Sequence, residues 1–152
     1  MSQRPTVADA ELILKLYDLR REAELRKARN WWLGFWPEKA EDVVTIATAL
    51  GTQENAWFRQ VSGYWEMAAA LVLHRTVNRE LFLEPSFCGE MFFIFAKVYP
   101  FLGELREKLH SPTAFGNVEQ LIKSSKGGSE RLQQMRERQA QWRKAAQLAA
   151  AS

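Results

Sequence analysis

Two glutamates in apolar surroundings are the residues whose type and position could support catalysis. Glu66 and Glu90 each interrupt an apolar segment, and each is followed by a methionine. If both carboxyl groups faced the core together, burial and mutual repulsion would raise one pKa, as in the acid/base pairs of hydrolases. A helical wheel instead places Glu66 beside Arg59, away from the core, and Glu90 near Lys97. We therefore expect a structural ion pair or a solvated edge for each, and keep a Glu66/Glu90 acid/base pocket as an alternative.

Metal-binding spacing occurs once, at Glu107 and His110. The Glu-x-x-His pattern of di-iron bundles needs two copies and further inward carboxylates, and this chain has one copy. Two histidines and the single Cys88 also do not make an ordinary structural zinc set. No phosphate-binding or nucleophile motif stands out. We predict no metal, no cofactor and no catalytic residues, and favour a protein that is not an enzyme.

An aromatic cluster ends the first long helical pattern, in the stretch WWLGFWP. Gly34 can take the left-handed conformation that ends a helix, and Pro37 suits the first turn of the next one. Rings at such a corner commonly close the end of a bundle, and docking of a partner is the main alternative. We therefore name Trp31, Trp32 and Trp36 as candidate interaction residues.

The C-terminal segment accounts for the net positive charge of the chain. Residues 123–152 hold seven of the 21 basic side chains but two of the 18 acidic ones, so this segment is +5 and the remainder −2. A basic helix with a tryptophan could neutralise phosphates and stack on a base, which makes nucleic acid an alternative partner. The candidate polyanion contacts are Arg131, Arg136, Arg138, Arg143 and Lys144.

Helical periodicity runs through almost the whole chain and predicts an all-α, single-domain bundle of five to six helices. We expect helices at about 6–33, 37–50, 52–76, 86–99 and 117–125, a Gly-rich linker at 126–129 and a basic helix over 130–152 that protrudes or docks. The expected bundle domain therefore covers residues 1–125, and the linker follows it. Thr6 with Asp9 resembles a capping box, and Thr52 and Ser129 are the expected caps of the helix at 52–76 and of the last helix. A wheel of the helix at 52–76 places five side chains in one inward stripe: Phe58, Val61, Trp65, Ala68 and Val72. Three apolar side chains on one edge of the last helix would dock on the body or on another subunit: Leu132, Met135 and Trp142.

Composition places the chain among ordinary globular proteins. It has 152 residues, of which 47% are hydrophobic and 26% charged. The apolar runs are too short and too often interrupted by charge to span a bilayer, and the N-terminus has no apolar export segment. One cysteine suits a reducing compartment. We expect a cytoplasmic location and no membrane span.

Three stretches resemble a group of small, uncharacterised bacterial all-helical proteins. They are DAELILKLYDLRREAELRKARNWW, ENAWFRQVSGYWEMAAALVLHR and GEMFFIFAKVYPFLGELRE, and the likeness covers roughly residues 8–125. It rests on the helix pattern and on the Tyr-Trp-Glu and Gly-Glu-Met triplets at 64–66 and 89–91. The resemblance implies a bacterial, intracellular, helical protein and carries no assigned reaction.

These observations favour a non-catalytic protein-interaction or scaffold module that self-associates. Contact would use the basic helix or the corner that holds Trp31, Trp32 and Trp36, which we call the tryptophan corner. The partner would be a second copy or another protein. A polyanion-binding accessory protein and an enzyme with a Glu66/Glu90 pocket are the two alternatives.

Overall fold

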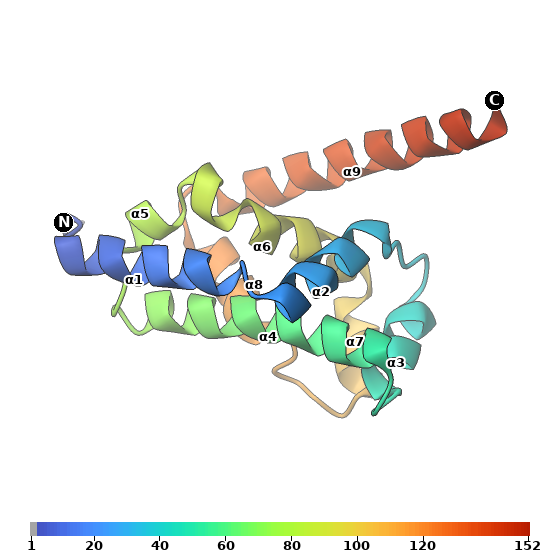
Figure 1. Ribbon diagram of the computed structural model, residues 1–152, viewed down its shortest axis with the longest axis horizontal. Coiled ribbons are helices and arrows are strands. Elements are labelled where there is room, and N and C mark those ends of the chain that lie inside the picture. Colours follow the sequence, from blue (N-terminus) through green and yellow to red (C-terminus); the bar gives the residue numbers. More distant parts are fainter. Residues whose placement is uncertain (1–2) are drawn as a thin grey trace.

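The computed structural model describes residues 3–152, and the regular elements of this range are all helices (Figure 1). They form one compact domain, so the all-α, single-domain prediction is confirmed. The helices are more numerous than the five to six predicted, because the first predicted helix is split in two and the short helices α5 and α7 lie between predicted ones. In chain order they are α1 (Val7–Leu19), α2 (Ala23–Gly34), α3 (Ala40–Thr48), α4 (Gln53–Leu73), α5 (Arg79–Phe82), α6 (Pro85–Val98), the 3-10 helix η1 (Tyr99–Phe101), α7 (Leu102–Lys108), α8 (Gly116–Ser124) and α9 (Gly128–Ala151).

The helical conformation is interrupted between α1 and α2, where the sequence predicts one continuous helix. Glu22 leaves the helical conformation with φ −57° and ψ 138°, and its carboxylate accepts hydrogen bonds from the backbone N–H groups of Glu24 at 3.0 Å and Leu25 at 2.9 Å. Side-chain capping of this kind satisfies N–H groups that a new helix leaves free. Glutamate is not among the preferred N-cap residues, and no Gly or Pro marks the break, so the sequence did not reveal it. The bend brings Arg20, at the end of α1, alongside α6.

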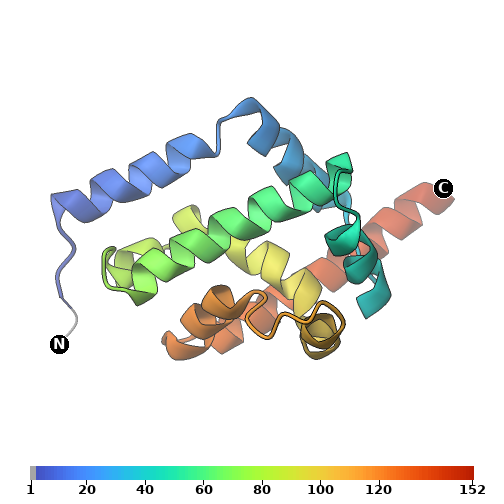
Figure 2. The ribbon, with the colours of Figure 1, turned by 90° about the horizontal axis from the view of Figure 1, so that it is seen from below.

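The core is built around α4. Its predicted inward stripe is confirmed, because all five members are buried: Phe58, Val61, Trp65, Ala68 and Val72. Figure 2 shows α4 through the middle of the molecule, with α1 and α2 on one side and α6 and α8 on the other. Thr52 caps α4 as predicted, by accepting a hydrogen bond from the N–H of Asn55. The aromatic helix α6 contributes Met91 and the rings of Phe92 and Phe95 to the same core.

The predicted Gly-rich linker is a tight, packed turn. Gly127 has φ 71° and precedes α9, which begins at Gly128 rather than behind a Ser129 cap. Gly128 is buried, and a Cβ atom there would lie 1.9 Å from the carbonyl oxygen of Ile122 in α8. This contact requires glycine and joins α9 closely to α8.

The long helix α9 is both docked and protruding. Leu132, Met135 and Gln139 are buried against the body, and the Gln139 side chain donates to the carbonyl oxygen of Phe93 at 2.8 Å. Beyond Gln139 every residue is exposed except the half-buried Arg143. Figure 1 shows these last turns extending past the other helices. We call residues 140–151 the α9 tip.

Candidate functional site

Glu66 and Arg59 lie on the same helix, α4, but form no ion pair within residues 3–152. Its two carboxylate oxygens accept hydrogen bonds from the backbone N–H groups of Asn117 at 3.3 Å and Val118 at 2.8 Å, at the start of α8. Arg59 donates instead to the side chain of Asn55 at 2.9 Å. A carboxylate at a helix N-terminus interacts favourably with the free N–H groups and the helix dipole. Glu66 therefore holds α8 against α4.

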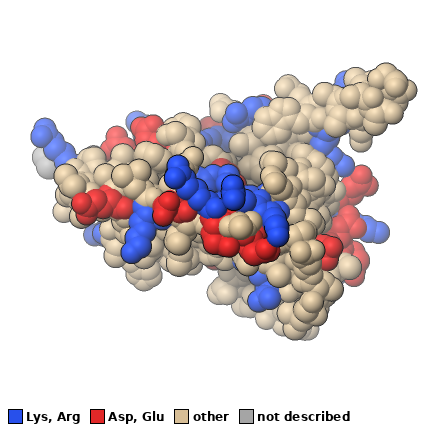
Figure 3. Space-filling model, viewed as in Figure 1, with Lys and Arg blue, Asp and Glu red and all other residues tan. Residues whose placement is uncertain are grey.

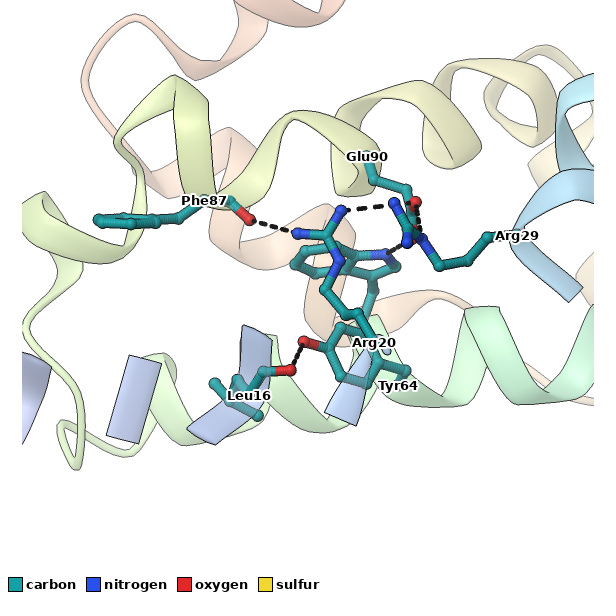
Figure 4. A network of polar contacts seen from close by, with 7 residues as sticks. Leu16, Arg20, Arg29, Tyr64, Phe87 and Glu90 are labelled. Carbon is teal, nitrogen blue, oxygen red and sulfur yellow. Dashed lines mark hydrogen bonds and ion pairs between the residues drawn. The ribbon is translucent and has the colours of Figure 1, made fainter. Parts of the chain in front are cut away.

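Glu90 is the centre of a partly buried polar network that joins four helices. Arg29 Nε of α2 donates to Glu90 Oε2 at 2.5 Å, and Arg20 Nη2 lies 3.6 Å from the same oxygen. Trp65 Nε1 of α4 donates to Glu90 Oε1 at 3.0 Å. Figure 4 shows both guanidinium groups converging on the carboxylate from the α1–α2 bend and α2. The expectation of an ion pair holds for Glu90, but its partners come from other helices and Lys97 is not one of them.

A tyrosine extends this network toward α1. The Tyr64 hydroxyl donates to the carbonyl oxygen of Leu16 at 2.5 Å, as Figure 4 shows. Burial raises the pKa of Tyr64 to about 12, although the positive charge of Arg20 acts in the opposite direction. The hydroxyl therefore stays protonated at neutral pH and serves as a donor between α4 and α1.

The two glutamates contact different helices, so the Glu66/Glu90 pair does not form one site. Glu66 faces α8, and Glu90 faces α1 and α2. A shared acid/base pocket requires two carboxyl groups within reach of one substrate, which this arrangement does not provide. The alternative based on that pocket is left without geometric support.

Lys97, predicted as a neighbour of Glu90, is a buried cation at the end of α2. It is 4% exposed, and its ammonium group donates to the carbonyl oxygens of Trp32 and Phe35, the latter at 2.8 Å. It also lies 3.8 Å from the centre of the Trp36 ring and 4.3 Å from that of Phe93. These carbonyls end α2, where a cation is favourable. A single lysine within FFIFAKVY is the signal that could have drawn attention to it.

Two opposed effects act on the charge of Lys97. Burial lowers its pKa to about 7, and the positive Arg143 of α9 contributes in the same direction. The backbone carbonyl oxygens and the faces of two aromatic rings favour the ammonium form, because each presents negative charge to it. Lys97 thus caps α2 with a charge that burial makes easier to lose than that of an exposed lysine.

The tryptophan corner is mostly internal. Trp32 is 1% exposed and stacks on Phe58 with ring centres 5.2 Å apart, so a partner could not reach it without unfolding the corner. Trp31 is half-buried and stacks on Phe35 at 4.7 Å. Trp36 is half-buried too and lies against Phe93. Closure of the bundle accounts for these contacts.

Of the basic residues of α9, three have partners within the chain. Arg131 donates to the carbonyl oxygen of Leu83 at 2.7 Å, Arg143 pairs with Glu38 at 3.1 Å, and Arg136 lies over the ring of Tyr99. Arg138 and Lys144 are exposed and make no such contact within residues 3–152. The positive charge available to a polyanion is therefore smaller than the sequence count indicates.

A sequence model of the family DUF4760, described as a domain of unknown function, matches residues 5–125. The chain belongs to this family. The likeness to a group of small helical proteins over roughly residues 8–125 is thereby confirmed. No curated protein and no solved structure matches the chain.

The DUF4760 region contains the whole Glu90 network, Glu66 and Lys97, whereas α9 lies outside it. Within residues 3–152, no three His, Cys, Asp or Glu side chains lie close enough together to hold a metal ion. None of the helices in the same range is long and apolar enough to cross a bilayer. Glu66, Glu90 and Lys97 each contact a neighbouring helix and so join the helices of this region.

Proposed function

We propose that this member of DUF4760 is a non-catalytic protein-interaction module that self-associates through the α9 tip. The observation that carries the proposal is that α9 stays helical for about three turns beyond Gln139, the last residue it buries against the body. On this segment Trp142 is 47% exposed, with its ring centre 6.2 Å from that of Phe93, and Leu148, beyond it, is 64% exposed. A short isolated helix is marginal in water, so a covering partner would stabilise it.

The chemistry of the tip suits a second copy of the chain. Residues 145–151 read AAQLAAA and carry no charge. Figure 3 shows this end of the molecule almost entirely in tan, apart from Lys and Arg atoms nearer the body. A twofold contact must match its own surface, which an uncharged stripe of alanines around one leucine does without unpaired charges. Alanine also allows close approach of two helices and favours the helical state.

The basic residues next to the tip would repel those of a second copy if the two helices paired in parallel, and an antiparallel pair of tips avoids this repulsion. If two tips cross near Leu148, the basic segments ending at Lys144 lie on opposite sides of the crossing, so their repulsion is small. The helix dipoles are then also opposed in direction, which is favourable. Both points favour antiparallel pairing of two copies over a parallel coiled coil.

Sedimentation velocity over a range of concentrations tests this proposal. We expect the full chain to form dimers, and Leu148→Gln to shift it to monomers because the substitution places an amide at the crossing. Leu50→Gln is the matched control, since Leu50 is 76% exposed at the turn before α4 and should leave the dimer intact. A full chain that stays monomeric at all concentrations, or a Leu148→Gln variant that dimerises like the control, would refute the proposal.

A further inference from the structure

A cleft of about 280 Å³ lies beside the Glu90 network. It opens between α2, α6 and α9, with Arg20 at the α1–α2 bend. Three charged side chains line it, Arg20, Arg29 and Glu90, which gives a net charge of +1. Apolar walls come from Phe93, Ile94 and Met135. A concave site with apolar walls and a few charged groups is the usual form of a small-molecule site.

The side chains around this cleft have spare hydrogen-bond donors. Trp32 lines it and is 1% exposed, yet its indole N–H has no acceptor within residues 3–152, and the same holds for Arg20 Nε. Arg29 donates only through Nε, so its terminal nitrogens have no hydrogen-bond partner in the described chain. Buried donors without acceptors are rare and costly. Trp32 Nε1 and Arg20 Nε are closed to solvent, whereas the Arg29 side chain is 32% exposed, so the donors that a ligand in the cleft can reach are the terminal nitrogens of Arg29, and such a ligand must bring acceptor atoms.

We propose that this cleft binds a small organic carboxylate. A carboxylate is planar and accepts two parallel hydrogen bonds from a guanidinium group, and its single negative charge matches the net +1 of the lining. A phosphate dianion would exceed that charge. The volume corresponds to about nine water molecules at roughly 30 Å³ each, so a ligand of the size of benzoate fits within it. Its apolar body would lie on Phe93, Ile94 and Met135.

Titration of the full chain with benzoate, followed by proton–nitrogen correlation spectra, tests the proposal. The Trp32 indole signal should shift and saturate, because its N–H lies in a side chain that lines the cleft. Benzamide has the same shape without the charge, and we expect no saturable shift with it. No shift with benzoate, or an equal response to benzamide, would overturn the proposal.

Two pairs of variants locate the binding. Gly89 lines the cleft, and a Cβ there meets nothing within 4 Å, so Gly89→Leu should fill the space without loss of helix stability. Gly63→Leu is its control, since Gly63 is equally open on α4 but lies outside the cleft. Arg29→Gln should weaken benzoate binding at least tenfold, a typical effect of losing a charged hydrogen bond, whereas the exposed Arg26→Gln should not.

Gly89→Leu keeps the proposal testable even if Arg29→Gln fails to fold. Benzoate that binds Gly89→Leu as tightly as the wild-type chain would show that it binds elsewhere. Equal weakening by Gly89→Leu and Gly63→Leu would contradict the assignment to this cleft as well.

Discussion

Removal of the charge of Glu90 is the most direct test of the network that joins α1, α2, α4 and α6. The substitution Glu90→Gln keeps the size of the side chain and leaves an oxygen that can still accept from Trp65 Nε1. It removes the negative charge that faces Arg20 and Arg29. Two guanidinium groups then remain next to each other without a counterion.

The expected loss of stability follows from the exposure of the three side chains. Breaking a fully buried ion pair from one side costs about 3–5 kcal/mol, because the remaining charge stays desolvated. Here the side chains of Arg20 and Glu90 are 12% and 16% exposed, but that of Arg29 is 32% exposed, so water can screen part of the unpaired charge. We therefore expect the free energy of unfolding to fall by about 2–3 kcal/mol.

Equilibrium unfolding in urea measures this loss. Urea is preferable to guanidinium chloride, because the latter is a salt and would screen the ion pairs under test. For a domain of this size, the same loss lowers the melting temperature by about 4–12 °C. Glu11→Gln is the matched control, since Glu11 is exposed on α1 and forms no ion pair within residues 3–152.

The reasoning fails if Glu90→Gln and Glu11→Gln have the same effect. It also fails if the loss for Glu90→Gln stays below about 1 kcal/mol, which is the range of exposed pairs. Either result would mean that the arginines remain solvated and that the network contributes little to holding the helices together.

Three further predictions concern single positions. The pKa of Lys97 in the folded chain, about 7, is below the usual value, so between pH 7 and pH 10 the unfolded chain binds a proton that the folded chain has released. The free energy of unfolding should therefore rise over this interval, by up to about 1.4 kcal/mol per pH unit. Lys97→Met should abolish the rise. Gly128→Ala should lower the free energy of unfolding by more than about 2 kcal/mol, because the new Cβ atom meets the Ile122 carbonyl. Gly63→Ala, at an open position in α4, should raise it by about 0.5–1 kcal/mol. Urea unfolding of the two variants compares these effects. Burial raises the pKa of Cys88, so a colourimetric thiol reagent should react slowly with the native chain and fast in urea; rapid native labelling would contradict that burial.

Helical periodicity and local capping rules predicted much of the fold. The stripe from Phe58 to Val72 is buried as the wheel indicates, because one face of α4 must meet the core whichever helices cover it. The Thr6 capping box also forms, with the Asp9 carboxylate accepting from the Thr6 N–H at 2.6 Å. Such features depend on residues close in sequence, so the sequence alone determines them.

The polar partners could not be predicted in the same way, because they depend on how helices pack. Glu90 and Lys97 share a helix, and the wheel therefore suggested a pair. In the fold, Glu90 meets arginines from the α1–α2 bend and α2, and Lys97 meets carbonyls at the end of α2. The interruption of the helix at Glu22, which positions Arg20, is not marked by Gly or Pro in the sequence. The errors over Glu90 and Lys97 thus trace to contacts between segments distant in sequence, whereas the break at Glu22 arises from a local cap of an uncommon residue type.

The close contact between Gly128 and Ile122 has a consequence for any assembly built on α9. Since the turn leaves no room for a side chain, α9 is held in one direction against the body, and its free part, residues 140–151, is a stiff lever of about 18 Å, at 1.5 Å per residue. One alanine inserted within residues 145–151 would rotate everything beyond it by about 100°. The spacing and relative orientation of two joined bodies are therefore encoded in the length of this rod.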